Sequence, residues 1–115
     1  MQTNIYGKRS EIIAADYLKK QGYKILEMNY KNQIGEIDII ANDGDYIVFI
    51  EVKARASEKF GHPLEAIDAR KQQKIHAIAS LYLMKNRKYG SACRFDAISI
   101  LGYDNQDITH IVNAF

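Results

Sequence analysis

The 115-residue chain contains one cysteine, one proline and no tryptophan. With Cys93 alone, no disulfide can form within the chain, which is typical of proteins from a reducing compartment. No stretch approaches the roughly 20 consecutive apolar residues that a membrane span needs, and the first residues lack the apolar segment of a signal peptide. We therefore expect a soluble, cytoplasmic protein without a membrane partner.

An excess of one charge sign is also missing, because 16 basic and 14 acidic side chains leave a net charge of only +2. This balance does not by itself predict nucleic-acid binding, so any positive surface must arise from the placement of the charges. No linker, internal repeat or low-complexity tract divides the chain. The length therefore predicts a single domain over residues 1–115.

The periodicity of apolar residues predicts two helices and five strands. Gly22 is a plausible helix stop, Pro63 suits the first turn of a second helix, and the Asp43-Gly44 pair favours a hairpin turn. The expected helices are residues 4–21 and 64–88, and the expected strands are residues 23–30, 36–41, 46–55, 93–101 and 108–112. The order α-β-β-β-α-β-β predicts an α/β (mixed α+β) fold in which helices cover a central mixed sheet.

Charged residues interrupt both strands of the expected hairpin, whose sequence is GEIDIIANDGDYIVFIEVKAR (35–55). Because side chains alternate between the two faces of a strand, Glu36 and Asp38 share one face, as do Glu51 and Lys53. Two registers are compatible with the turn: one pairs Glu36 with Glu51 and the other pairs Asp38 with Glu51. Both registers place all four charged side chains on the same face of the hairpin.

Apolar residues lie on both faces of this hairpin, so we expect both faces to be covered. The charged face also carries Ile40, Ile47 and Phe49, and the opposite face carries Ile37, Ile39, Val48, Ile50 and Val52. Two carboxylates about 4 Å apart repel by about 4 kcal/mol at an effective dielectric constant near 20. A Mg²⁺ or Mn²⁺ ion would offset this repulsion with ligands of the type it prefers. A solvated face with a Lys53–Glu36 ion pair is the alternative.

The first expected helix places an acid at the end of its apolar face. Glu11 precedes Ala14, Ala15 and Leu18 by three, four and seven residues and therefore shares their face. One interpretation is that Glu11 joins the charged hairpin. The alternative is that Glu11 reaches solvent near the N-terminal end of the helix, where it favours the helix dipole.

Two lysines lie along the apolar stripe of the second expected helix, which we assign to Ile67, Ile75, Ile78 and Tyr82. Lys71 and Lys74 follow Ile67 by four and seven residues. Their stems could cover apolar surface while the ammonium groups reach water. The functional alternative is that both cations contact a phosphate backbone.

Elsewhere, Arg94 and Asp96 share one face of an expected strand, and we expect an ion pair that braces the sheet. The three histidines, His62, His76 and His110, have no spacing typical of a zinc site, so loop or surface roles are expected for them.

The GEID segment, followed after a short turn by FIEVKAR, resembles the PD-(D/E)xK nuclease superfamily. The whole chain more closely resembles the YraN-type family, which is related to archaeal Holliday-junction resolvases. Five blocks in chain order carry this resemblance: GKRSEIIAADYLKKQGY, NYKNQIGEIDII, VFIEVKAR, KQQK and CRFDAISI. The resemblance implies a restriction-endonuclease-like core.

The resemblance also implies roles for individual residues. Asp38 matches the first metal-binding acid, Glu51 and Lys53 match the ExK motif, and Glu11 matches the helix-borne glutamate of the resolvase-like branch. Glu36 belongs to the GEID signature without a defined role. Ile37 stands where the superfamily name has proline, a common departure.

The implied site holds Mg²⁺ or Mn²⁺ through Asp38, Glu51, Glu11 and the backbone carbonyl of Val52. Lys53 would orient or deprotonate the attacking water. Arg55, Lys71 and Lys74 would contact phosphates, and the loop at residues 56–63, with its Lys59 and Gly61, would border the site. The list of catalytic candidates is therefore Glu11, Asp38, Glu51 and Lys53.

The implied function is that of a metal-dependent endonuclease acting on nucleic acid, in particular branched DNA, with a homodimer expected by analogy with the resolvases. The alternative is a nucleic-acid-binding or protein-interaction module that keeps the nuclease scaffold without catalysis.

Overall fold

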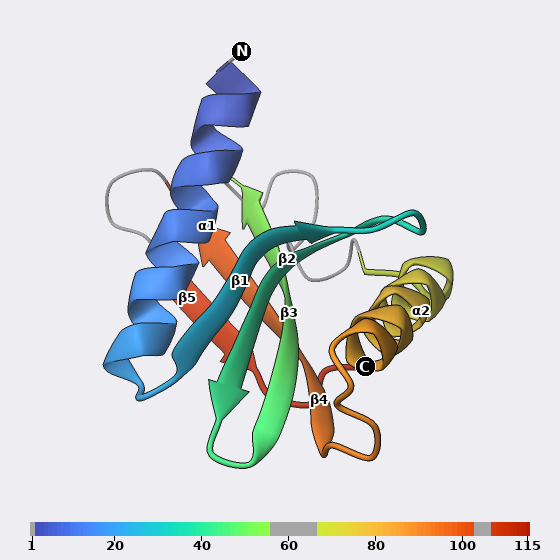
Figure 1. The fold of residues 1–115 in the computed structure, drawn as a ribbon. Helices are drawn as coiled ribbons and strands as arrows, with labels where there is room; N and C mark the ends of the chain where they lie inside the picture. The colour runs from blue at the N-terminus through green and yellow to red at the C-terminus, as the bar shows by residue number, and fades with distance from the viewer. Residues whose placement is uncertain (1, 56–66, 103–106) are drawn as a thin grey trace.

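The computed structural model describes residues 2–55, 67–102 and 107–115. Two helices and five strands follow one another in the predicted order (Figure 1). They are α1 (Gln2–Lys20), β1 (Lys24–Lys31), β2 (Glu36–Asp43), β3 (Tyr46–Arg55), α2 (Ala69–Lys85), β4 (Cys93–Leu101) and β5 (Asp107–Ile111). The predicted α/β class is therefore confirmed. No helix in the described ranges combines the length and the apolarity that crossing a membrane requires.

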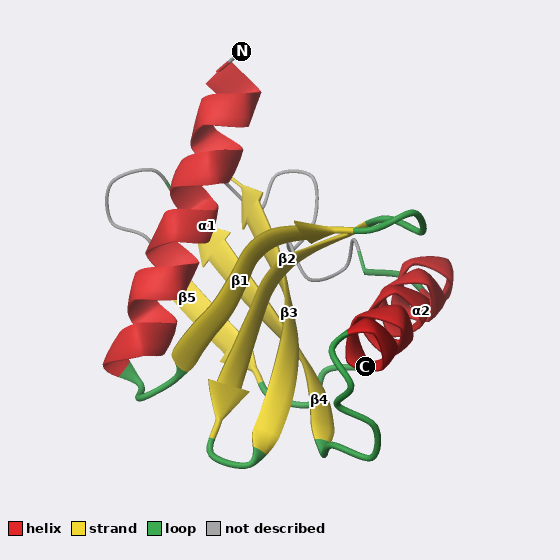
Figure 2. Ribbon diagram, in the orientation of Figure 1, coloured by secondary structure: helices red, strands yellow, loops and turns green. Residues whose placement is uncertain are grey.

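The five strands form one mixed sheet in the order β1-β2-β3-β4-β5. The pairs β1–β2, β2–β3 and β4–β5 are antiparallel, whereas β3 and β4 run parallel. A parallel pair needs a crossover connection, and α2 belongs to the connection between β3 and β4 (Figure 2). The carboxyl ends of the parallel strands β3 and β4 therefore lie side by side.

Helix α1 covers one face of the sheet. Its buried residues Ala14 and Leu18 pack against Ile39, Ile50 and Ile98, so the predicted apolar face of this helix is confirmed. The helix ends in a Schellman motif, in which the Tyr23 N–H donates to the Leu18 carbonyl at 2.9 Å and the Gly22 N–H to the Lys19 carbonyl at 3.0 Å. This motif requires the positive φ of Gly22, +93°.

Helix α2 packs on the other face, where Ile75, Ile78 and Tyr82 contact the cluster of Ile40 and Phe49. The predicted stripe is correct for these three residues but wrong for its first member. Ile67 and Asp68 precede the helix, which begins at Ala69 and ends at Lys85 rather than Lys88. The reason is the N-cap: the Asp68 carboxylate accepts the Lys71 N–H at 2.9 Å. The expected loop at residues 56–63 and the expected helical start at residues 64–66 lie outside the described residues.

The β2–β3 hairpin adopts the second of the two predicted registers, in which Ile39 pairs with Ile50 and Asp43 with Tyr46. Its turn consists of two residues, Gly44 and Asp45, and Gly44 takes a positive φ of +59°. Both predicted turns allow the same charged face. The register thus brings the carboxyl end of β3 toward the amino end of β2.

The expected alternation fails at one residue of β2. Ile37 was assigned to the face of Ile39, yet it packs with Ile40 in the cluster under α2. The described pairs of β2 with β3 begin at Ile39, whereas its pairs with β1 continue to Glu36. Beyond Ile39, β1 and β2 form a two-stranded ribbon, which twists more strongly than a wider sheet. Figure 1 shows this ribbon turning away from β3 toward α2.

Candidate metal centre

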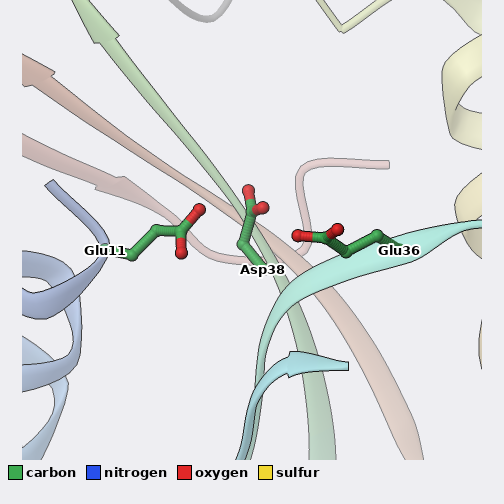
Figure 3. Close-up of side chains that lie close together, drawn as sticks. All are labelled: Glu11, Glu36 and Asp38. Atoms are coloured by element: carbon green, nitrogen blue, oxygen red, sulfur yellow. The ribbon is translucent and has the colours of Figure 1, made fainter. Parts of the chain in front are cut away.

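Three carboxylates from two elements converge where β2 leaves β3. Glu11 comes from α1, whereas Glu36 and Asp38 come from the first residues of β2, and each offers an oxygen within 4.8 Å of the others. Figure 3 shows Asp38 between the two glutamates. Asp38 and Glu11 are half-buried and Glu36 is exposed. The structure thus brings Glu36, which the sequence left without a role, next to two of the predicted metal ligands.

The separation of the two strands explains the position of Asp38. The Val52 N–H donates to Asp38 Oδ2 at 2.8 Å. In a regular ladder this N–H would donate to a backbone carbonyl of the neighbouring strand, and here the Asp38 side chain replaces that carbonyl. Asp38 therefore lies between β2 and β3, where side chains from both faces of the sheet can reach it. The bond fixes one carboxylate oxygen of Asp38 relative to β3.

Glu51 also lies within electrostatic and hydrogen-bond reach of Asp38. This residue is only 6% exposed and has two cationic partners. Lys71 Nζ lies 3.3 Å from Glu51 Oε1, and Lys53 Nζ lies 3.8 Å from the same oxygen. Lys71 thus reaches into the site from α2 as a neighbour of Glu51. We refer to Glu11, Glu36, Asp38 and Glu51 together as the carboxylate cluster.

The electrostatics of the cluster disfavour full ionisation of its acids. Burial, together with the charge of Glu51 and a hydrogen bond to it, raises the pKa of Asp38 from 3.8 to about 8. The Val52 N–H opposes this shift but does not cancel it. Four ionised carboxylates facing two ammonium groups leave an excess of two negative charges. A single divalent cation would balance that excess.

The two lysines beside Glu51 differ in exposure and in the direction of their pKa shifts. Burial, followed by the hydrogen bond to Lys71, lowers the pKa of Lys53. Burial also lowers the pKa of Lys71, but the hydrogen bond to Lys53 and the charge of Glu51 outweigh this effect and raise it. The side chain of Lys53 is 19% exposed and that of Lys71 is 37% exposed. The more buried lysine is therefore the one that loses its proton more readily.

Asn29 is a member of the site that the sequence analysis missed. Its side-chain amide donates to Glu11 Oε1 and, at 3.4 Å, to Glu36 Oε1, so it bridges the two glutamates. Asn29 belongs to β1 but has a positive φ of 52°. Asparagine is depleted in strands and enriched in this left-handed conformation. An asparagine inside a predicted strand was therefore the available signal.

The remaining predicted phosphate contacts lie outside the carboxylate cluster. Arg55 is exposed at the end of β3, where its guanidinium donates to the Ala54 carbonyl at 3.2 Å. Lys74 crosses the backbone of Gly35, where a Cβ would lie 2.8 Å from Lys74 Cε and 3.1 Å from Ile78 Cδ1. The glycine of the GEID segment thus permits the close approach of α2. The Val52 carbonyl remains a predicted ligand.

A second charged group surrounds Asp96 on the α1 face of the sheet, near the β2–β3 turn. Arg94 donates to both oxygens of Asp96 at 2.9 Å, which is the predicted ion pair, and its Nη1 donates to Asp43 at 2.8 Å. His110 Nε2 lies 2.7 Å from Asp96 Oδ2, and Arg94 Nη2 donates to the Tyr23 hydroxyl at 2.5 Å. We call these residues the Arg94–Asp96 network.

A family profile described as "Uncharacterised protein family UPF0102" matches residues 10–100. The chain belongs to the UPF0102 family. This finding confirms the resemblance to the YraN-type family, and the matched segment contains the carboxylate cluster and both lysines beside Glu51.

Several UPF0102 proteins match almost the whole chain. Those of Clostridioides difficile and Persephonella marina are 46% and 47% identical to it over 109 and 111 residues, respectively. The first alignment covers 95% of both proteins, and the second covers 96% of this chain and 93% of its relative. A UPF0102 protein of Thermodesulfovibrio yellowstonii is 49% identical over 110 residues, covering 95% of this chain and 94% of the relative.

Proposed function

We propose that this UPF0102 protein is a metal-dependent nuclease that hydrolyses phosphodiester bonds of nucleic acids. The observation that carries the proposal is the convergence of Glu11, Glu36 and Asp38 beside Glu51, which itself pairs with two lysines. Burial raises the pKa of Asp38 and lowers that of Lys53, and neighbouring acids and bases with shifted pKa values are typical of active sites. The resemblance to PD-(D/E)xK nucleases supports the same chemistry.

The donor atoms of the cluster fit a hard divalent cation. All are carboxylate oxygens, which suit Mg²⁺ or Mn²⁺, and a cation beside Asp38 would offset the burial and the charge of Glu51 that raise its pKa. Asp38, Glu51 and Glu11 would hold the ion, with the Val52 carbonyl beside them and Glu36 able to contribute from β2. When bound, such an ion lowers the pKa of a water molecule and neutralises charge on the phosphate.

The chain's own groups have separate tasks in this proposal. Lys53 is partly buried and has a lowered pKa, so it can accept or direct a proton of the attacking water. Lys71 is more exposed and keeps its charge, so it can contact the phosphate while its bond to Glu51 keeps it in place. Arg55 and Lys74 lie farther out and would contact neighbouring phosphates, which position a strand without reading its sequence.

The relation to Holliday-junction resolvases adds two finer proposals. Branched DNA would be the preferred substrate, and a homodimer would place two such sites on one junction. Both are proposed by analogy with those enzymes.

A cleavage panel tests the proposal directly. Junction, flap, single-stranded and duplex DNA, together with single-stranded RNA, are incubated with Mg²⁺, Mn²⁺ or EDTA. We expect cleavage that needs the metal and that falls about a thousand-fold in Glu51→Gln, since this variant removes a charged metal ligand. Glu27→Gln is the matched control, because Glu27 is an exposed glutamate of β1 outside the cluster.

Calorimetric titration with Mn²⁺ complements the cleavage panel. Heat that is present in wild type and in Glu27→Gln but lost in Glu51→Gln supports a metal site. Metal-independent binding of nucleic acid without turnover would identify an inactive binding module instead. Absence of cleavage for every substrate with either ion contradicts the nuclease proposal.

A further inference from the structure

A cavity of about 230 Å³ lies on the α2 side of the sheet, beside the carboxylate cluster. It lies between the start of α2, the middle of β4, the end of β5 and the last residues of the chain. Its walls are formed by Ile67, Gln72, Ala97, Ile111, Ala114 and Phe115. Neither the metal-binding groups nor the proposed phosphate contacts belong to this cavity.

Two contacts place the cavity immediately next to the site. Ala97 pairs with Glu51 in the parallel β3–β4 register, and neighbouring strands lie about 4.8 Å apart. On α2, Gln72 of the cavity directly follows Lys71, whose ammonium group contacts Glu51. A phosphate that contacted Lys71 would therefore lie beside the cavity.

The walls offer both apolar side chains and polar groups, which suit the faces and the polar edge of a nucleobase. Five of the six lining residues are apolar, and the sixth, Gln72, carries an amide. Its Nε2 donates to the Ile67 carbonyl at 3.2 Å, which leaves a second N–H and the amide oxygen for a ligand. An amide of this kind pairs well with the donor and acceptor edge of a base.

An aromatic group extends from the wall of the cavity. The Phe115 ring lies 5.8 Å from the Phe95 ring and 6.1 Å from the imidazole of His76. The exposed His76 ring stacks on Phe95 at 3.8 Å with an interplanar angle of 19°. Stacking on such rings stabilises unpaired bases with little dependence on their identity.

We infer that this cavity binds one unstacked nucleobase of the strand that Lys71 holds. The inference rests on the proposed function for the position of the phosphate, and it adds a substrate class to that function. A base inside a duplex would have to leave its stack before it could enter the cavity. The site therefore acts on nucleic acid that has an unpaired base next to the phosphate, such as a single strand or the branch point of a junction.

Two probes of equal length and charge test the inference without cleavage. The first is a thymidine decamer, and the second is a decamer of abasic deoxyribose phosphate. Their affinities are measured by fluorescence anisotropy at low salt, with Ca²⁺ in place of Mg²⁺. Because base stacking contributes roughly 1–3 kcal/mol per base, we expect wild type to bind the thymidine decamer at least about ten-fold more tightly.

Variants of the cavity separate base binding from phosphate binding. Ala114→Leu fills the cavity and should reduce affinity for the thymidine decamer roughly ten-fold, with no change for the abasic decamer. Ala77→Leu is the matched control, because Ala77 is an exposed alanine of α2 outside the cavity. Gln72→Ala, compared with Gln73→Ala, gives a second test if the leucine variant does not fold, as judged by circular dichroism.

Equal affinities of wild type for the two decamers, or equal affinities of each variant and its control for the thymidine decamer, would overturn the inference. The result is distinguishable from failure of the proposed function. Metal-dependent cleavage with no effect of the cavity variants refutes the cavity alone. A base preference that depends on the cavity, without cleavage of any substrate, refutes the nuclease alone.

Discussion

Asp38 and Asp96 are both shielded from water, yet their surroundings shift their pKa values in opposite directions. Asp96 is fully buried; burial raises its pKa, but hydrogen bonds from His110, Arg94 and the Asn113 N–H outweigh burial and hold the pKa below its usual value. Asp38 accepts one backbone N–H while facing other carboxylates, and its pKa rises to about 8. Burial acts on both aspartates, so their partners decide the sign of the shift.

The comparison separates a network that stabilises the fold from the cluster that we propose as the functional site. In the Arg94–Asp96 network, donors from β4, β5 and the C-terminal residues surround one carboxylate, which ties these elements together. In the carboxylate cluster, α1, β2 and β3 bring like charges together, which costs stability. Groups of like charge that lower stability in this way are expected at functional sites.

The largest difference in the free energy of unfolding should appear when each aspartate is replaced by asparagine. Asp96→Asn should lower the free energy of unfolding by about 3 kcal/mol, because Arg94 loses its buried anionic partner. Asp38→Asn, measured in EDTA at pH 7, should change it by less than about 1 kcal/mol, since the amide oxygen can still accept the Val52 N–H. Urea unfolding followed by circular dichroism measures both. A larger loss for Asp38→Asn than for Asp96→Asn would contradict the comparison.

The two aspartates should also affect the pH dependence of stability in opposite directions, with smaller changes in the free energy of unfolding than those at pH 7. The raised pKa of Asp38 contributes stability that is fully present below its unfolded value near 3.8 and is lost as pH rises toward about 8. The depressed pKa of Asp96 contributes stability that is present above pH 3.8 and is lost as pH falls through its folded value. Each slope is at most about 1.4 kcal/mol per pH unit.

Melting temperatures in EDTA from pH 3 to pH 9 test this difference. Asp38→Asn should flatten the fall of stability between pH 5 and 8, whereas Asp96→Asn should flatten the fall below pH 4. If Asp38→Asn left the curve between pH 5 and 8 unchanged, the raised pKa of Asp38 would be refuted.

The smallest changes in the free energy of unfolding are expected when a neutral partner of the Arg94–Asp96 network or of the carboxylate cluster is replaced. Tyr23→Phe removes one acceptor from Arg94 and should cost about 1 kcal/mol. Asn29→Gly removes the amide that bridges Glu11 and Glu36 but retains the positive φ, so it should cost about 0.5 kcal/mol in EDTA. The same urea unfolding assay compares them. A cost above 2 kcal/mol for Asn29→Gly would mean that the amide is a structural support of the cluster.

The sequence was sufficient for the order of elements, which depends on local periodicity, and for the shared face of the charged residues in the hairpin, whereas the roles of the site residues came from the family resemblance. The bounds of β3 and β4 agree with the predicted ranges 46–55 and 93–101, since each strand is a long apolar run with clear turn signals. The spacing of Glu11 to Ala14 and Leu18 fixed its face on α1 but left a solvent-facing role open, and the family resemblance assigned it to the site. Such spacings hold wherever the element stays regular.

The errors arose where a regular element bends or where a cap competes with a pattern. Ile37 changes face because the ribbon of β1 and β2 twists away from β3, which no period-two pattern encodes. The apolar spacing of Ile67 predicted a longer α2, but the side chain of Asp68 caps the helix, which therefore begins at Ala69. Asn29 was missed because its role depends on a backbone conformation inside a strand.

The departure of β2 from β3 beyond Ile39 has a consequence for protein engineering. A designer who regularised this sheet, by extending the β2–β3 ladder to Glu36, would satisfy the Val52 N–H with a backbone carbonyl and gain an ideal hairpin. The same change would remove the position that Asp38 occupies between the strands. Idealising the backbone would thus yield a more regular scaffold without the proposed metal site, because the irregularity of the sheet is what gives Asp38 its place beside Glu11 and Glu36.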